Sequence, residues 1–530
     1  MAKREELKFS FSARPKKRVK NKSYLGQKDD QHSSVIGNFK AEIADNCDFE
    51  VNKEQGRVTL KKRKGYAALG NSAVGVEENL GLGDYHYFAS GTDTETLMAS
   101  FNSGSSSIVF NYSADGSWLE QAGASAMTQD KHVVYQNANN SMYLYNGSDS
   151  VRKYNNTTWT ALSTGVPVSG VGEIGKYAVW HKSMNFVAGM TTYPSRVYIS
   201  ALADPEDFTS ADYITVNPED GNIITGLGSL QDFVVVFKSQ GIYLISGDSP
   251  TTASLTQRSK DIGCLSHFSI AEGKSASGQP VVYFLGNGID GAPAIYMFDS
   301  VTVKRISDDI QTELEELNVQ QLSKAAGIWD INKYKVSIPD GAATTNDKEL
   351  VYYPDIDQWV VNTGKRPGHY IVYEGGNDIG NTFFADSNNS GLVYQDNSGV
   401  VDQDTLISFT WQGRSEDDGE PYMDKKWKKM WITTNTIGDT QMSAFASVDE
   451  ANFIYIGALS LSSSTQWGDS GITWGDGVTI WGGASDISKH RLSLDVNRGK
   501  NLKLKYQSEQ SAGQEKVYEH SLFYKAKKIK

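Results

Sequence analysis

A thiol and an imidazole stand three positions apart in the sequence, at Cys264 and His267. Such a pair could supply a nucleophile and its base, if the ring reached the sulfur and the thiol pKa were lowered. A small cysteine between apolar segments is more typical of strand packing, and we expect that role for Cys264. Cys47 is the other cysteine, and we expect both thiols to be buried and reduced.

Two glycine-rich segments have part of the spacing of phosphate-binding loops. Residues 286–291 match Gly-x-Gly-x-x-Gly, but Ala-Pro and another apolar run follow. A dinucleotide site needs a helix there, because the N-terminus of that helix holds the pyrophosphate. Residues 273–275 end like a P-loop, yet Phe268 stands where the first Gly belongs. We therefore expect ordinary turns in both segments, and no nucleotide cofactor.

Acidic turns at residues 340–341 and 396–399 carry oxygen ligands that suit a cation. Neither has the spacing of an EF-hand loop, and both sequences are typical of ordinary turns. The eight histidines and two cysteines show no zinc-binding spacing. Among the 63 Asp and Glu residues, no pair is marked by its context as a glycosidase pair. We expect no catalytic residue, no metal site and no cofactor, and hence a protein that is not an enzyme.

Paired apolar runs organise the chain. The clearest pair lies in residues 232–250, where Phe-Val-Val-Val-Phe and Ile-Tyr-Leu-Ile flank a polar turn with Gly. β-Branched and aromatic runs around such a turn indicate a hairpin. Six similar hairpins are predicted, with strands at 85–88 and 97–101, 133–135 and 142–145, 177–180 and 196–199, 281–284 and 295–298, 334–338 and 350–353, and 382–384 and 392–394. Their spacing of roughly 45–55 residues predicts a mainly β fold with a propeller of six or seven blades over residues 67–404.

The segments before and after the propeller differ from it. Residues 1–30 form a basic arm, and residues 31–66 contain strands that we expect to join a platform. Residues 405–530 contain about seven strand-like runs, which indicate an antiparallel β-sandwich or platform domain.

One helix is predicted inside the propeller region. Ser307 is a suitable N-cap, and two aspartates follow it in the first turn. Ile310, Leu314 and Leu317 then recur at spacings of four and three, so they share one face. We expect a bracing helix.

Charge is unevenly distributed. The formal net charge is −12, yet the first 22 residues carry nine Lys or Arg and two Glu, which leaves −19 for the remainder. So acidic a body is expected to repel nucleic acid. The basic arm could contact an acidic partner or DNA, or it could be a solvated tail that docks as a strand. No apolar h-region follows the arm and no run of about 18 apolar residues occurs, so we expect neither a signal peptide nor a membrane span.

Tryptophan recurs every seven residues near the C-terminus, at Trp467, Trp474 and Trp481. The intervening Gly and Asp exclude a coiled coil and indicate a turn-rich loop, suited to a subunit interface or a glycan contact. Residues 469–474 (Asp-Ser-Gly-Ile-Thr-Trp) resemble the Asp-box turn of sialidase-like propellers. Trp467 stands where the Ser of that motif belongs, and the turn is not repeated along the predicted blades.

Several segments together resemble the nozzle, or tail tubular protein B, family of short-tailed bacteriophages and the related packaged-DNA stabilisation proteins. The most specific is residues 195–208, an Arg-Val-Tyr-x-Ser strand that runs into an Asp-Pro-Glu-x-aromatic turn. The other segments are residues 46–49, 56–58, 63–66, 220–227, 238–247, 261–266 and 305–307. The resemblance covers about residues 46–310, and the C-terminal sandwich fits more loosely.

The resemblance implies a structural protein of the virion tail, assembled in the host cytoplasm. Such proteins form rings, usually of six copies, below the head-to-tail adaptor, and they also meet tail fibres. Viral double-stranded DNA passes through the ring, and an acidic lumen would let it slide. Blade loops could form a gate that retains the DNA and then releases it. We expect Arg14, Lys16, Lys17 and Arg18 to contact the adaptor.

Two other classes of function stay open. A carbohydrate-binding propeller for host attachment would use the exposed indoles of Trp467, Trp474 and Trp481. A sialidase-like glycosidase would need two carboxylates about 5 to 10 Å apart.

Overall fold

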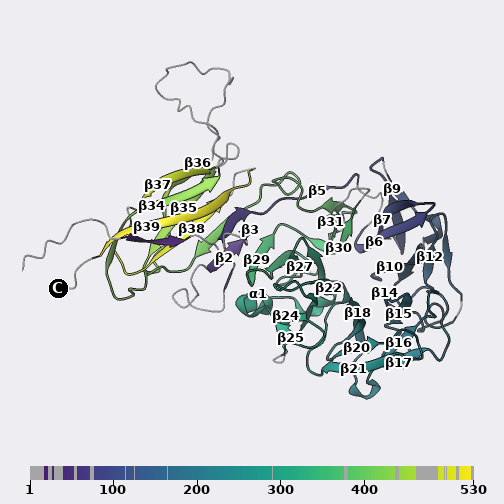
Figure 1. Cartoon of the computed structure of the whole chain (residues 1–530). Coiled ribbons are helices and arrows are strands. Elements are labelled where there is room, and N and C mark those ends of the chain that lie inside the picture. Colours follow the sequence, from purple (N-terminus) through teal and green to yellow (C-terminus); the bar gives the residue numbers. More distant parts are fainter. Residues whose placement is uncertain are drawn as a thin grey trace, which may run out of the picture.

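The computed structural model describes most of the chain. The described residues are 17–21, 27–28, 40–52, 57–71, 77–113, 115–124, 126–163, 165–288, 291–374, 380–388, 390–435, 441–460, 487–494, 496, 498–508 and 513–526. They form a β-propeller, on the right in Figure 1, and a β-sandwich on the left. The mainly β fold predicted from the sequence is confirmed.

Seven four-stranded antiparallel units form the blades of the propeller. The first three blades are β6–β9 (Asn79–Ala89, Thr92–Ser103, Ser106–Tyr112, Trp118–Glu120), β10–β13 (Val134–Ala138, Ser141–Tyr145, Arg152–Tyr154, Trp159–Ala161) and β14–β17 (Tyr177–His181, Met184–Ala188, Arg196–Ile199, Tyr213–Thr215). Blades four and five are β18–β21 (Ile224–Leu230, Phe233–Lys238, Ile242–Ser246, Ser254–Ser259) and β22–β25 (Ala271–Lys274, Pro280–Asn287, Pro293–Phe298, Val303–Arg305). Blade six is β26–β29 (Ala326–Asp330, Lys333–Ile338, Lys348–Tyr353, Gln358–Thr363), and blade seven is β30–β32 (Pro367–Tyr373, Asn381–Asp386, Val393–Gln395) with β5 (Ala67–Ala68).

The first strands of the blades form a closed ring around the axis. Each of them contacts the first strand of the next blade, and β30 of blade seven contacts β6 of blade one. A strand from the N-terminal side of the propeller region completes the last blade. Ala67 and Ala68 pair with Gln395 and Tyr394, and they form the outer strand of blade seven.

Alternating side chains of β19, the second strand of blade four, enter two different cores. In β19, Val234 and Val236 pack in the core shared by blades two to four, whereas Val235 and Phe237 pack in the core between blades four and five. Strands buried on both faces are expected to be apolar throughout, and this explains the continuous Phe-Val-Val-Val-Phe run. Gly241 completes the turn to β20 with a φ of 127°, which favours glycine.

One predicted hairpin has the wrong partners. Residues 177–180 were expected to pair with 196–199, but β14 pairs with β15, and β15 lies between β14 and β16. The sequence of β15, Met-Asn-Phe-Val-Ala, is short and contains a polar Asn185, which is fully buried. The other six predicted pairings correspond to adjacent strands of the structure.

The sandwich is assembled from both ends of the chain. One sheet contains β3 (Cys47–Asn52), β4 (Arg57–Lys62), β39 (Lys516–Ala526), β34 (Lys425–Asn435), β37 (Ile487–Ser493) and β1 (Lys17–Asn21). The other contains β2 (Ala41–Asp45), β33 (Phe409–Gly413), β38 (Leu502–Ser508), β35 (Gln441–Val448) and β36 (Ile454–Ser460). This second sheet continues into blade six, because Asp45 of β2 pairs in parallel with Val361 of β29.

The helical segment after blade five is short. A 3₁₀ turn, η4 (Asp308–Ile310), leads into α1 (Gln311–Glu315), and Ile310, Leu314 and Leu317 are buried as predicted. Ser307 lies at the predicted N-cap position, but its hydroxyl makes no cap bond and instead accepts the N–H of Ile295 at 3.0 Å. Within the described residues, no helix is long and apolar enough to cross a membrane.

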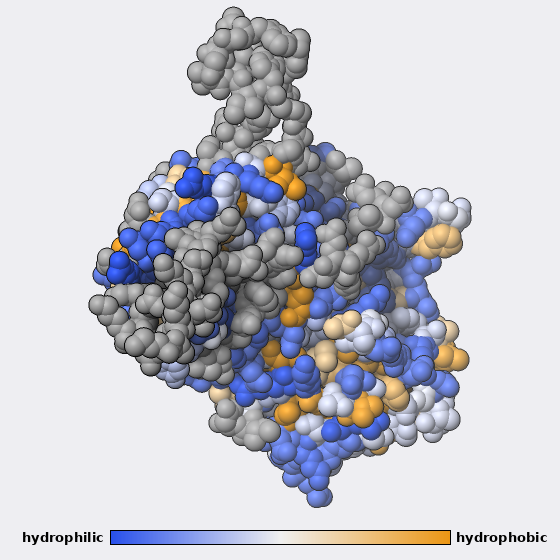
Figure 2. Space-filling model, turned by 60° about the vertical axis from the view of Figure 1, so that its left-hand side comes forward, coloured by the Kyte–Doolittle hydropathy of each residue, from blue (hydrophilic) through white to orange (hydrophobic). Residues whose placement is uncertain are grey.

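Hydrophilic residues cover much of the described surface on the face in Figure 2, and hydrophobic residues appear there in scattered groups.

Candidate functional site

The chain passes from the sandwich into the propeller at a buried polar junction. Asn46 follows β2 with a left-handed φ of 52°, a conformation that asparagine tolerates well. Its amide nitrogen donates to the hydroxyl of Thr363 at 2.9 Å and to the carbonyl of Ser408 at 2.7 Å. Asn46 therefore ties the N-terminal strands both to the end of blade six and to the segment that leaves the propeller.

Arg63 carries a buried charge at this junction. Its guanidinium donates to both carboxylate oxygens of Asp402, at 2.7 and 2.5 Å, and through Nε to Oδ1 of Asn46 at 2.8 Å. A further bond from Nη2 reaches the carbonyl of Thr363 at 2.9 Å. Two parallel N–H···O bonds give a geometrically specific ion pair, so Arg63 orients the chain as it enters the propeller.

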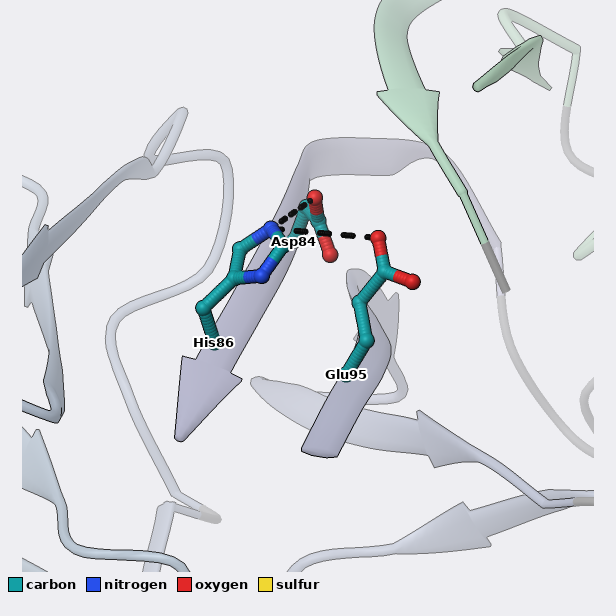
Figure 3. A group of neighbouring side chains, drawn as sticks. All are labelled: Asp84, His86 and Glu95. Carbon is teal, nitrogen blue, oxygen red and sulfur yellow. Dashed lines mark hydrogen bonds and ion pairs between the residues drawn. The ribbon is translucent and has the colours of Figure 1, made fainter. Parts of the chain in front are cut away.

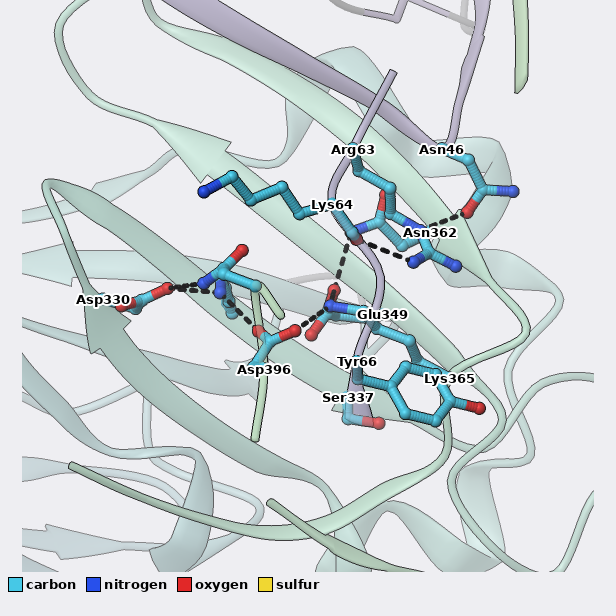
Figure 4. Close-up of polar contacts among 12 residues, drawn as sticks. Asn46, Arg63, Lys64, Tyr66, Asp330, Ser337, Glu349, Asn362, Lys365 and Asp396 are labelled. Carbon is cyan, nitrogen blue, oxygen red and sulfur yellow. Dashed lines mark hydrogen bonds and ion pairs between the residues drawn. The ribbon is translucent and has the colours of Figure 1, made fainter. Parts of the chain in front are cut away.

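A second buried charge cluster joins blades six and seven (Figure 4). The ammonium group of Lys335 forms an ion pair with Asp330 and lies 2.7 Å from Oδ2 of Asp396. Lys365 lies 2.5 Å from Oδ1 of Asp396 and 3.6 Å from Oε2 of Glu349. Three carboxylates thus share two ammonium groups, and neutral donors supply the remaining bonds: the Tyr370 hydroxyl to Glu349, the Thr382 hydroxyl to Asp330, and the Asn362 amide to Glu349.

The charges in this cluster hold one another ionised. Burial acts against the ionised carboxylates, but the Lys335 ammonium group overcomes it and lowers the pKa of both Asp330 and Asp396. Burial likewise disfavours the charged Lys335, yet Asp396 and Asp330 raise its pKa above the ordinary value. An adjoining pocket of about 10 Å³ has room for a single water molecule. The arrangement is suited to holding two blades together.

Aromatic and imidazole rings fill one end of the propeller axis. Phe268 lies 5.6 Å from His132 and 4.7 Å from His369, measured between ring centroids. Phe268 lies just before blade five, His132 lies just before blade two, and His369 lies in blade seven. Segments from three such distant blades can meet only at the axis. Burial lowers the pKa of His132 to about 4 and that of the neighbouring His267 to about 3, which leaves both rings neutral near pH 7.

Two of the segments that carry the family resemblance contribute contacts at joints between blades. Glu206, in the Asp-Pro-Glu turn after β16, accepts the Tyr143 hydroxyl at 2.7 Å and pairs with Lys153, both from blade two. The buried Lys238 of blade four reaches back to Asp220, its Nζ lying 2.6 Å from Oδ1. These motif residues therefore brace neighbouring blades.

A group of three potential metal ligands lies on the β6–β7 hairpin of blade one. Asp84, His86 and Glu95 place one ligand atom each within 4.8 Å of the others. Figure 3 shows one ring nitrogen of His86 facing both carboxylates. Burial, followed by the charge of Glu95, raises the pKa of Asp84 to about 7, against the opposing effect of His86.

Sequence reasoning missed this group, because Glu95 is nine positions from His86 in the chain. The available signal was the Asp-x-His spacing, which places Asp84 and His86 on one face of a strand. With a two-residue turn at 90–91, the register then sets Glu95 opposite His86, as the structure has it.

Most of the predicted contact residues lie outside the described part of the chain. This holds for Trp467, Trp474 and Trp481 in the predicted loop, and for Arg14 and Lys16 in the arm. Lys17 and Arg18 lie in β1, which pairs with β39 of the sandwich, but their side chains are not described. Residues 17–21 of the arm thus dock as a strand.

Other residues singled out in the sequence have structural positions. Cys264 is fully buried and donates to the carbonyl of Ser266 at 3.1 Å, while burial raises its pKa to about 12. It is therefore not an activated nucleophile. Residues 396–397 form a turn after β32, as expected, but the carboxylate of Asp396 is buried between two lysines and does not face solvent. Nothing in the local sequence distinguishes such an aspartate from one in a solvated turn.

Residues 118–327 match the family model described as Bacteriophage P22 Gp10, beta-propeller. The matched segment begins at β9 and ends in β26, so it contains blades two to five and covers less than half of the chain. It supports a relationship to a phage propeller family. No curated protein matches the chain.

Several solved propeller-containing structures are similar to the chain at low identity. The Neurospora crassa Pan2 WD40 domain has 7% identity and a TM-score of 0.39, over 63% of this chain and 96% of that one. YCF48 bound to D1 peptide has 10% identity and a TM-score of 0.37, over 62% and 94%. An exo-β-1,3-galactanase from Phanerochaete chrysosporium has 8% identity and a TM-score of 0.24, over 77% and 97%. At these TM-scores, the likenesses carry no information on function.

Proposed function

We propose that this protein is a structural component of a bacteriophage tail, which forms part of the nozzle that conducts DNA out of the virion. The observation that carries the proposal is the match of residues 118–327 to a phage propeller family. The bracing role of the motif residues agrees with it, because Glu206 and Lys238 act in holding blades together. A tail component must keep its shape while DNA passes.

The distribution of charge supports contact with DNA without tight binding. Residues 67–404 contain 39 Asp and Glu but only 18 Lys and Arg, so the propeller region carries a net charge of −21. DNA carries a negative charge on every phosphate and is repelled by such a surface. A conduit lined by this region lowers the friction on the moving DNA.

The conduit itself is formed between copies in this proposal. The side chains of His132, Phe268 and His369 fill one end of the axis within each propeller. DNA therefore passes through the centre of a ring of subunits, of which we expect six. The basic arm, with Arg14, Lys16, Lys17 and Arg18, contacts the head-to-tail adaptor, and tail fibres attach to the assembled ring.

Native mass spectrometry of the purified chain, alone and with its adaptor ring, tests the proposal. We expect a monomer alone and six copies on the adaptor. Reversing the charges of Arg14, Lys16, Lys17 and Arg18 to Glu should prevent assembly. The same reversal at the exposed Arg258, Lys260, Lys274 and Lys304 is the matched control, and it should leave assembly intact.

A monomer that does not assemble on the adaptor would contradict the proposal. If that monomer also bound a host polysaccharide and lost binding on replacement of Trp467, Trp474 and Trp481, host attachment would be favoured. Turnover of the polysaccharide would instead favour the glycosidase alternative.

The proposed loop gate has a separate test. Electron cryomicroscopy of full and emptied particles should show different loop positions, and identical loops would exclude the gate.

A further inference from the structure

Blade one brings one imidazole and two carboxylates together at the end of its inner hairpin (Figure 3). Asp84 and His86 are two residues apart on β6, so they point to the same face of the sheet. Glu95 on β7 is the direct cross-strand partner of His86. The ligand atoms lie close already: Nε2 of His86 is 2.8 Å from Oδ2 of Asp84 and 3.8 Å from Oε1 of Glu95.

The surrounding groups hold this arrangement in place. The other ring nitrogen of His86, Nδ1, faces Oδ2 of Asp93 at 3.5 Å, as in the carboxylate–histidine pairs that orient metal-binding imidazoles. The backbone N–H of Glu374, in blade seven, donates to Oε1 of Glu95 at 2.9 Å. Oδ1 of Asp84 is buried and has no hydrogen-bond partner among the described residues.

The backbone that carries the ligands is fixed by the next blade. The side-chain amide of Asn137, in β10 of blade two, donates to the carbonyl of Asp84. Its oxygen accepts the N–H of His86 at 3.5 Å. Blades one, two and seven all contribute to the group. It therefore lies where the first and last blades of the ring meet.

We propose that Asp84, His86 and Glu95 bind a divalent metal ion of the zinc type. One imidazole nitrogen and two carboxylate oxygens are a donor set that Zn²⁺ accepts, whereas Ca²⁺ and Mg²⁺ prefer oxygen ligands alone. Ligand atoms around tetrahedral zinc lie about 3.3 Å apart, from bond lengths near 2.0–2.1 Å. The distances from Nε2 of His86 to the two carboxylates, 2.8 and 3.8 Å, lie on either side of this value. Small side-chain rotations would therefore bring the three ligand atoms to the spacing that zinc needs.

Solvent reaches the group from the side of His86, whose side chain is 42% exposed. A water molecule or a group from a neighbouring subunit completes the coordination. The bound metal joins β6 to β7 and, through Glu374, stiffens the joint between blades one and seven. A ligand that binds only the folded state stabilises it in proportion to the logarithm of its free concentration.

Zinc binding to the untagged, chelator-treated full chain tests this site. We expect one zinc per chain by native mass spectrometry, and a melting temperature that rises with zinc concentration. His86→Gln and Asp84→Asn should each abolish both effects. Asp93→Asn should weaken zinc binding about 10- to 100-fold, because it removes only the group that orients the imidazole.

His490→Gln is the matched control, because His490 lies in β37 of the sandwich and contacts Thr434. This variant should bind zinc as the wild type does. Circular dichroism without metal shows whether each variant is folded. The proposal is overturned if the wild type binds no stoichiometric zinc, or if folded His86→Gln and Asp84→Asn proteins bind it as tightly as the wild type. Calcium or magnesium binding in place of zinc would also overturn it.

Discussion

Arg63 and Asp402 are 339 positions apart in the chain, yet their side chains form a buried bidentate ion pair. Arg63 lies just before β5, the strand with which the chain enters the propeller, and Asp402 follows blade seven, where the chain leaves it. Because β5 completes blade seven, the entry and exit of the propeller lie side by side. The ion pair joins them at the point where the ring closes.

Breaking this pair from one side should be costly. Asp402→Asn leaves the Arg63 guanidinium buried without its counter-charge, and such losses cost about 3–5 kcal/mol of unfolding free energy. Urea unfolding of the variant measures the change. Asp404→Asn, two residues away and exposed, should change the unfolding free energy by less than about 0.5 kcal/mol. Equal effects of the two variants would show that the ion pair does not stabilise ring closure.

Gly263 should tolerate no side chain. A Cβ there would lie 2.1 Å from the carbonyl oxygen of Lys238 and 2.6 Å from that of Ser239, and backbone atoms cannot rotate away. We expect Gly263→Ala to lower the unfolding free energy by about 1–3 kcal/mol. At Gly368 the nearest atom to an added Cβ is 3.4 Å away, so Gly368→Ala should be nearly neutral. Thermal melts of both variants check this, and a stable Gly263→Ala protein would contradict it.

Buried histidines should make stability fall as the pH falls from about 6.5 to 4. Burial lowers the pKa of His132 to about 4 and that of His520 to about 3, whereas an unfolded histidine titrates near 6.5. The unfolded state therefore binds more protons in this range, and the stability present above pH 6.5 is lost toward the folded pKa values. Asp84 and Asp45 oppose the trend, because burial raises their pKa to about 7 and about 6.

His520→Gln isolates one of these contributions. His520 is buried in the sandwich, where its Nδ1 lies 3.0 Å from the Tyr506 hydroxyl. Removing one proton-linked group should reduce the slope of unfolding free energy against pH by about 1.4 kcal/mol per pH unit between pH 4 and 6. Urea titrations at several pH values measure the slope. An unchanged slope would mean that His520 is not buried in its neutral form.

Neither cysteine should react in the folded protein. Both thiols are buried, and burial raises the pKa of Cys47 and Cys264, so neither forms an accessible thiolate near pH 7. We expect a chromogenic disulfide reagent to modify no thiol in native protein and two thiols per chain after denaturation. Rapid modification of one thiol in buffer alone would contradict the described packing.

Local patterns were enough to predict most hairpins. In residues 232–250 the apolar runs and the Gly turn act over a few positions, and short-range backbone preferences determine the pairing. The same reasoning correctly placed Ile310, Leu314 and Leu317 on a buried face. It failed at residues 177–199, where β15 with its buried Asn185 lies between the two runs. A polar residue inside a strand interrupts the apolar signal, even where its amide nitrogen is bonded in the core, as that of Asn185 is to the Tyr145 hydroxyl.

The sequence by itself thus determined the strand-rich repeat, the acidic propeller region and the strand-rich C-terminal segment, because periodicity and composition are local properties of the chain. Only the tertiary structure decided that there are seven blades, and that Ala67 and Ala68 complete the last one. It also brought Arg63 to Asp402, and Lys335 to Asp396. These pairings depend on which distant segments meet when the ring closes. Burial of apolar faces drives that closure, and the charged partners then satisfy one another where water is excluded.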